Sequence, residues 1–357
     1  MESYLILWSL ILISYSIGKV SNIKIIFPAL ACLLLSLVFG LREKNFGTDT
    51  NEYHAIYNDF SFSASSLELL ANLHIAFFKN FNLPAEAWIF SYFFLFILFL
   101  IKSIILNSWK DDPLLLIIST FPFISFSTNI IRAGLAFAIF LYACAIYSKQ
   151  DKISINQILL FTLSSLIHFS IIVPIIFFIT FDLLRNKYIY RYIRFLWIPS
   201  ILFYILKIDA VRALVEIINN GLIPVPQRFS DKIFFYENIH SQESLTLGGT
   251  YLIILITFII YNFNPILKKN INRNLFLSIS FFMTSIYLTA YPLLVSYSTY
   301  ARVNLYFEFF SYFLIHFLIS ITSPKKISYL MTLIIPTFFF FKNINNGLNN
   351  GSLLPIF

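Results

Sequence analysis

The sequence predicts an all-α protein that crosses a membrane many times. Of its 357 residues, 59% are hydrophobic and 12% are charged, and the mean hydropathy of +0.80 is too high for a soluble domain. Apolar runs of spanning length recur along the chain and are separated by short basic clusters. We therefore expect a polytopic helical membrane protein, with residues 1–357 forming a single transmembrane domain.

About twelve apolar segments are expected to be helices. The first has no basic n-region and no small-residue cleavage site, so it is expected to stay in the protein as a helix. The segments are 3–18, 22–40, 85–107, 113–129, 131–148, 154–167, 169–184, 195–207, 250–265, 275–296, 303–322 and 327–342. The stretch 154–184 is too long for one span, and we divide it at His168, which places Pro174 near the start of the second helix, where proline is tolerated.

The basic residues give this arrangement an orientation. With Met1 outside, most of the 25 Lys and Arg residues fall in short cytoplasmic connections, as the positive-inside rule requires. A single helix over 154–184 would instead place the basic cluster 185–194 outside. The two longer loops, about 41–84 and 208–249, are then external.

Several classes of protein are disfavoured. The net charge of +8 does not indicate nucleic-acid binding, because the basic residues lie in clusters between apolar runs. Cys32 and Cys144 lie inside apolar segments and are expected to be unreactive. The sequence has no DxD triplet, and the adjacent pair Asp111-Asp112 falls in a cytoplasmic turn. Since a P-loop and a dinucleotide fingerprint are also missing from the sequence, we expect neither a metal nor a cofactor.

The external loop 41–84 contains a predicted helix. Gly47 permits a tight turn, and Thr48 or Asp49 can cap a helix that follows it. The residues that repeat there at helical spacing are Tyr53, Ile56, Tyr57 and Phe60. One interpretation is an amphipathic helix on the membrane surface, for which the turn is only a cap. The other places Arg42 and Asp49 at the mouth of an outer cavity, because they flank the point where the chain leaves the second helix.

Three basic or potentially basic residues lie at predicted outer helix ends. Arg132 begins an apolar helix among small residues such as Gly134, His168 stands between two helices, and Arg302 precedes Tyr306 by one turn. Arg132 can alternatively be a snorkelling side chain, and His168 can be satisfied by hydrogen bonds between helices. Because a charge near hydrocarbon costs several kcal/mol, three such residues on one side favour an active site on the outer face.

The second external loop, 208–249, offers groups that suit a sugar. Arg228 and Tyr236 supply hydrogen-bond donors and an aromatic face for stacking on a pyranose ring. A solvated loop that binds no ligand is the alternative interpretation.

The chain resembles the EpsG family and the wider Wzy-type O-antigen and capsule polymerases on motifs that occur in order. These motifs are Arg42 with Gly47-Thr48-Asp49 and Tyr53, then Ile131-Arg132-Ala133-Gly134-Leu135-Ala136, then Leu166-Ile167-His168-Phe169-Ser170, with Arg302 and Tyr306 as a C-terminal match. The resemblance is clearest over roughly residues 30–180. It implies a GT-C-like bundle of helices in the bacterial inner membrane, with an active site facing the periplasm or the cell exterior.

The resemblance also implies a reaction. A growing glycan on undecaprenyl diphosphate would be moved to a second lipid-linked repeat unit, and a chain-length regulator protein is a candidate partner. Arg132 and Arg302, followed by Arg42 and Arg228, would stabilise the charge on the leaving diphosphate. Either His168 or Asp49 would be the base for the acceptor hydroxyl. The remaining residues assigned to substrate binding are Thr48, Tyr53, Tyr236 and Tyr306.

Two other functions stay open. A flippase for lipid-linked sugars would place ionisable residues near the midplane of the membrane. Here Glu308 and His316 are the ones expected at that depth, and we find no internal sequence repeat, so an enzyme is favoured. A ligase that moves the finished glycan to a different lipid would use the same donor and the same residues.

Overall fold

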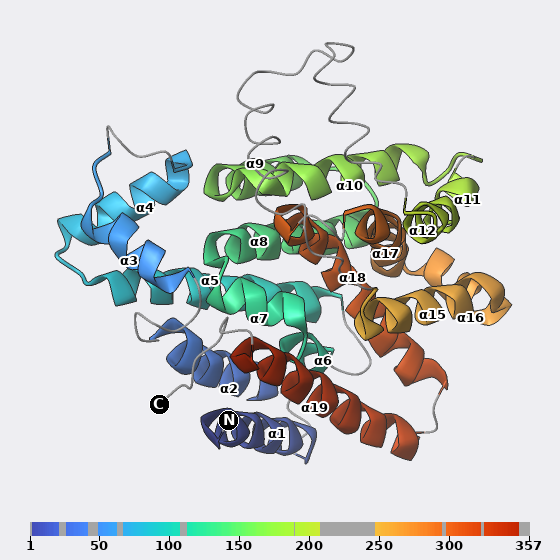
Figure 1. The fold of residues 1–357 in the computed structure, drawn as a ribbon, viewed down its shortest axis with the longest axis horizontal. Coiled ribbons are helices and arrows are strands. Elements are labelled where there is room, and N and C mark those ends of the chain that lie inside the picture. Colours follow the sequence, from blue (N-terminus) through green and yellow to red (C-terminus); the bar gives the residue numbers. More distant parts are fainter. Residues whose placement is uncertain are drawn as a thin grey trace, which may run out of the picture. The chain divides into compact units, whose positions relative to one another are not determined.

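The computed structural model describes residues 2–20, 26–41, 49–62, 67–107, 113–188, 190–207, 247–294, 298–322 and 325–349. These residues form helices joined by turns and include no strand, which confirms the all-α class (Figure 1). The chain divides into two compact units. Unit 1 comprises Met1–Ile175 with His316–Phe357, and unit 2 comprises Ile176–Ile315.

Each described helix other than α10 and α18 lies entirely within one of the two units. Those of unit 1 are α1 (Glu2–Val20), α2 (Ile26–Leu35), the π-helical turn η1 (Ser36–Gly40), α3 (Thr50–Asn58), α4 (Leu69–Asn80), α5 (Ala85–Leu106), α6 (Leu114–Ile118), α7 (Phe121–Thr128), α8 (Ile131–Gln150), α9 (Ile155–Ile167), the 3-10 turn η2 (Phe169–Ile171) and α19 (Lys325–Asn349). Those of unit 2 are α11 (Tyr190–Ile193), α12 (Trp197–Ile205), α15 (Gly249–Phe263), α16 (Pro265–Arg273) and α17 (Leu275–Leu294). Helices α10 (Ile172–Leu184) and α18 (Ser298–Thr322) run from one unit into the other.

Five described helices are long and apolar enough to cross a membrane: α5, α8, α17, Arg302–Ile321 of α18 and Ile327–Asn349 of α19. Helices α15 and α16 make a sixth if this pair, bent by 92°, is counted as one span. Ile26–Gly40, Ile155–Ile167 and Phe169–Leu184 are apolar but shorter. The polytopic membrane architecture is thus confirmed, and the expected number of about twelve spans stays a prediction.

Helix α8 forms the centre of unit 1. It packs against α5, α7 and α9, and its side chains are buried on every face, which is typical of a helix surrounded by others (Figure 1). A Cβ added to Gly134 would lie 2.8 Å from Cβ and 2.9 Å from the carbonyl oxygen of Phe126, so the backbone of α7 lies directly against α8. The small residue two positions after Arg132 therefore allows another helix backbone to come close.

The predicted helix over 113–129 is interrupted. Helix α6 ends at Ile118, and α7 starts after Thr120, whose side chain accepts a hydrogen bond from the Phe123 N–H. Pro122 lies in the first turn of α7, where its missing N–H is not needed. A threonine cap followed by proline therefore starts a new helix inside an apolar run.

The predicted division at His168 is confirmed. Helix α9 ends at Ile167, and His168 has an extended backbone (φ −154°, ψ 119°). The turn η2 follows, and α10 begins at Ile172, with Pro174 in its first turn. Two helices therefore meet at the histidine.

Unit 2 is built around α17, which packs against α12, α15 and α16. Phe258 of α15 stacks on Phe281 of α17 with ring centroids 4.3 Å apart. Glu308 of α18 is buried and accepts a hydrogen bond from the Tyr312 hydroxyl at 2.8 Å. The acid expected deep in the membrane is therefore paired inside the protein.

Candidate active site

A single carboxylate, that of Glu68, joins Arg132 to His168. Oε2 of Glu68 lies 2.5 Å from Nη1 of Arg132, and Oε1 lies 3.0 Å from Nδ1 of His168. The backbone N–H of Phe169 donates a second hydrogen bond to Oε1 at 3.1 Å. Both carboxylate oxygens are therefore bound by groups from two other parts of the chain.

The local backbone directs Glu68 toward these partners. Glu68 immediately precedes α4 and is extended (φ −65°, ψ 154°), and its side chain makes no hydrogen bond to the start of that helix. Its carbonyl oxygen accepts from the Asn72 N–H, while the Asn72 side chain donates to the Leu67 carbonyl. Helix α4 packs against α5 and α9, which brings the carboxylate to the end of α9.

Arg132 is the second residue of α8 and is mostly enclosed, with a side chain 16% exposed. Its Nη1 donates to Glu68, and its Nε is buried with no hydrogen-bond partner among the described residues. Because the guanidinium pairs inside the protein, snorkelling to the membrane surface does not account for it. Glu68 therefore engages only part of a guanidinium that has five N–H donors.

His168 is held from one side of its ring. Its side chain is 28% exposed, and Nδ1 faces Glu68. The hydroxyls of Ser164 and Ser165 both donate to the Phe161 carbonyl of their own helix. The side-chain partner of Nδ1 is therefore the carboxylate of Glu68, which precedes α4. The alternative interpretation required a partner on a neighbouring helix.

The cluster determines the charge on Glu68. Burial alone would raise the pKa of this carboxyl, but the hydrogen bond from His168 and the positive charges of Arg132 and protonated His168 outweigh it. The pKa is held at about 2, below its ordinary 4.5. Glu68 is thus ionised at neutral pH and can only accept hydrogen bonds.

Helix α3 packs beside this cluster. The Tyr53 hydroxyl donates to the Asn129 carbonyl at 2.9 Å, three residues before Arg132. The rings of Tyr53 and Tyr57 both contact Trp88 of α5, with centroids 6.1 Å and 5.6 Å away. The apolar face of α3 is therefore buried against protein, so it does not rest on a membrane surface.

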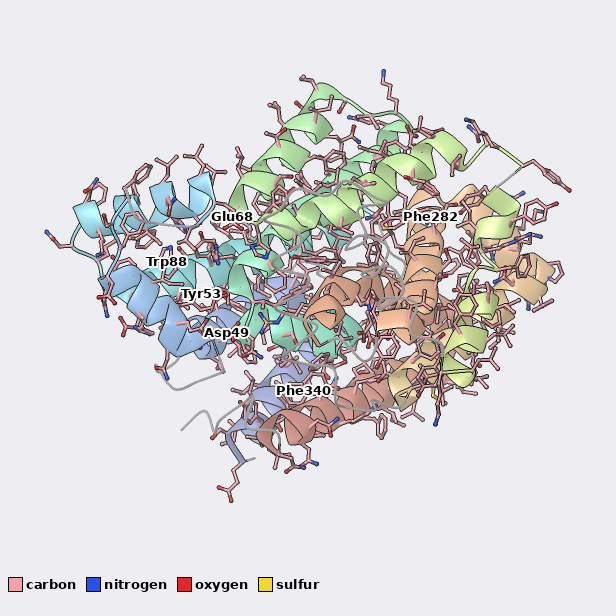
Figure 2. All side chains as sticks on the ribbon, turned by 45° about the horizontal axis from the view of Figure 1, so that its top comes forward. Asp49, Tyr53, Glu68, Trp88, Phe282 and Phe340 are labelled. Carbon is pink, nitrogen blue, oxygen red and sulfur yellow. The ribbon has the colours of Figure 1, made fainter. Side chains whose placement is uncertain are left out.

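Asp49 precedes α3, as predicted, but its side chain makes no capping hydrogen bond. The helix ends at Asn58, so the predicted repeat through Phe60 runs past its end. Figure 2 shows Tyr53 on α3 and Asp49 at the start of this helix, whereas Glu68 lies beside the green helix α9.

The other residues predicted for the site lie either in unit 2 or outside the described part of the chain. Arg302 and Tyr306 lie one turn apart on α18 in unit 2, where Arg302 is exposed and Tyr306 is buried. The predicted residues outside the described part of the chain are Arg42, Thr48, Arg228 and Tyr236. Within unit 1, the structure brings Arg132 and His168 together and places Tyr53 at the turn before Arg132.

Sequence reasoning missed Glu68. Its loop is predicted to be external, but no spacing rule links this residue to partners 64 and 100 residues away. The available signal was an acid directly before an amphipathic helix in a loop facing two basic residues. Among the described residues, no three His, Cys, Asp or Glu side chains gather as metal ligands would.

A family model described as the EpsG family matches residues 24–355, which is most of the chain and includes every candidate residue named above. No curated protein and no solved structure matches the chain.

Proposed function

The chain belongs to the EpsG family, and from this premise we propose that it is a polysaccharide polymerase that joins lipid-linked repeat units. The family supports a polymerase-type function in a multi-pass membrane protein. The observation that supports a site at Arg132 and His168 is that Glu68 binds both side chains. This carboxylate holds a guanidinium and an imidazole together at the start of α8 and the end of α9. We place this site on the periplasmic or outer face of the inner membrane.

The proposed reaction transfers the growing glycan from undecaprenyl diphosphate. The acceptor is a hydroxyl of the terminal sugar on a second lipid-linked repeat unit. Its oxygen forms a bond to the anomeric carbon of the donor glycan, and the bond from that carbon to the phosphate oxygen breaks. Undecaprenyl diphosphate leaves with the electron pair, and the acceptor proton passes to a base.

Arginines are the proposed stabilisers of the leaving group. A fixed guanidinium stabilises developing phosphate charge without reorganising, and it binds two oxygens at once. Arg132 keeps donors that Glu68 does not use, and its Nε has no partner among the described residues. Arg302, which is exposed on α18, is the second proposed arginine, and Arg42 and Arg228 are further candidates. Because these charges do the work of a divalent cation, we propose that no metal is required.

Further residues are proposed to bind the sugar. Tyr53 is fixed at the turn before Arg132, while Thr48, Tyr236 and Tyr306 are carried as candidates from the sequence motifs. The base is His168 or Asp49 on sequence grounds. A chain-length regulator protein remains a candidate partner.

The test is reconstitution. The purified protein is placed in lipid nanodiscs with synthetic undecaprenyl-diphosphate-linked repeat units, and the products are separated by length. A ladder of longer glycans supports polymerisation. A single transfer to a different lipid acceptor would indicate a ligase, and movement of intact units across a vesicle membrane without any longer product would indicate a flippase.

A further inference from the structure

We propose that Glu68 is a positioning residue of this reaction: it holds His168 with a proton on Nδ1, so that Nε2 is the base that accepts the proton of the acceptor hydroxyl. The inference rests on the proposed polymerase function and deepens it. It assigns the base to His168 and gives a role to a residue that no motif had identified.

The geometry fixes the orientation of the ring. Oε1 of Glu68 lies 3.0 Å from Nδ1 of His168 and also accepts from the N–H of Phe169, the next residue along the chain. The imidazole and its own backbone are therefore tied to the same oxygen. Oε2 is held by Arg132, which stops the carboxylate from rotating away. The ring thus has one nitrogen committed to Glu68.

The charge of Glu68 selects the tautomer. Its pKa of about 2 keeps it ionised at neutral pH, and an ionised carboxylate has no proton to donate. Nδ1 must therefore carry the hydrogen of this hydrogen bond. A neutral imidazole has one N–H, so the lone pair is on Nε2. Nε2 is the ring nitrogen that Glu68 does not hold, and the side chain as a whole is 28% exposed.

The same contact favours proton transfer. When Nε2 takes the acceptor proton, the ring becomes an imidazolium that is 3.0 Å from a carboxylate. The acceptor oxygen is then free to bond to the anomeric carbon, and the imidazolium later releases its proton to water. A carboxylate in this position orients the imidazole and stabilises its charged form without itself becoming protonated. Arg132 supports the arrangement by keeping Glu68 ionised.

Kinetics of Glu68→Gln test the proposal. Glutamine keeps the size of the side chain, but its amide can donate as well as accept, so the tautomer is no longer enforced. We expect the turnover number to fall by about 10²- to 10⁴-fold with little change in KM, which is the range for a general base and its orienting carboxylate. The matched control is Glu86→Gln. Glu86 also faces a histidine, since its Oε1 lies 3.9 Å from Nδ1 of His54, and it should retain wild-type turnover.

A double variant separates positioning from a structural role. Because Glu68 acts through His168, the variant Glu68→Gln/His168→Ala should be no slower than His168→Ala alone. If the two losses multiply, Glu68 acts independently of His168 and the proposal is overturned. Wild-type turnover in Glu68→Gln overturns it as well.

A spectroscopic measurement does not depend on activity. In protein labelled with ¹⁵N at histidine, the His168 signal is assigned by its loss in His168→Asn. Wild type should show a protonated Nδ1 and an unprotonated Nε2, and Glu68→Gln should show a mixture or the opposite tautomer. Protonation of Nε2 alone in the wild type would overturn the positioning role even if a glycan ladder forms. If the wild type makes no ladder, the polymerase proposal fails, and the tautomer result still decides whether Glu68 fixes His168.

Discussion

Nη1 of Arg132 and Oε2 of Glu68 form an ion pair at 2.5 Å across 64 residues of sequence. The two side chains are 16% and 21% exposed, so water screens the pair only in part. The pair ties the start of α8 to the residue before α4, and through the other carboxylate oxygen it reaches the end of α9. The Glu68 carboxylate therefore links the start of α8 to the end of α9, which belong to two separate sequence motifs.

Arg132→Ala and Arg302→Ala are expected to abolish chain growth while membrane insertion is retained. The lost interaction is with the diphosphate, and Arg132→Ala also leaves Glu68 without its charged partner. Lysine at either position should rescue poorly, because an ammonium group lacks the planar fork. Glycan length and protein abundance are measured together in membranes. Arg185→Ala is the control, since Arg185, the residue after α10, pairs with Asp182 of that helix at 3.6 Å. Full-length polymer from both alanine variants would exclude the leaving-group role.

The Glu68 cluster should make stability depend on pH in the acidic range. The pKa of Glu68 is lowered from 4.5 to about 2 on folding, so the carboxylate stabilises the folded state above pH 4.5. That contribution, about 3 kcal/mol at most, is lost as the pH falls from 4.5 toward 2. Thermal unfolding in detergent should show wild type more stable than Glu68→Gln at pH 6, with the difference shrinking below pH 4.5. A constant difference across this range would contradict the pairing.

Gly134→Ala should destabilise unit 1. The added Cβ would lie 2.8 Å from Phe126 Cβ and 2.9 Å from its carbonyl oxygen, so the backbones of α7 and α8 must separate. Overpacking of this kind costs about 1–3 kcal/mol, and it would displace Arg132 two residues away. Gly249→Ala is the matched control, because nothing lies within 4 Å of the added atom there. Equal melting temperatures and equal polymerase rates for the two variants would show that the close approach is unimportant.

Chelation tests whether arginines replace a divalent cation. If fixed guanidiniums carry the charge on the leaving diphosphate, excess EDTA should leave the polymerase rate unchanged. The rate is measured in nanodiscs before and after chelation, and then again with added magnesium or manganese. A loss with EDTA that either ion restores would instead point to two acids as ligands: Asp49 and Glu52, which lies in the first turn of α3.

The features that could be predicted are those that follow from the length of an apolar segment or from the free-energy cost of a charge near hydrocarbon. The break at His168 followed from a stretch too long for one helix. Arg132 became a candidate because of its position at an apolar helix end, and the structure encloses it beside Glu68. Glu68 could not be predicted in the same way, because an acid in a polar external loop is ordinary until its partners are known. The break between α6 and α7 was predictable from Thr120 and Pro122, but the apolar run around them concealed it.

The last prediction concerns the two sides of the membrane. The turn at His168 is expected outside and the basic cluster 185–194 inside, because α10 spans the 13 residues between Ile172 and Leu184, about 20 Å of helix. Ser170→Cys and Lys187→Cys, made in a protein without Cys32 and Cys144, are treated with an impermeant maleimide. Position 170 should react from the periplasmic side, and position 187 should react only after the membrane is opened.

A second experiment tests whether Arg132 and Arg302 share one diphosphate site. If they do, cysteines at these two positions should be joined by a cross-linker shorter than about 25 Å, since long side chains on either side of a ligand reach no farther. If position 187 is labelled from outside, or the pair 132 and 302 cannot be joined, the outward-facing shared site is wrong.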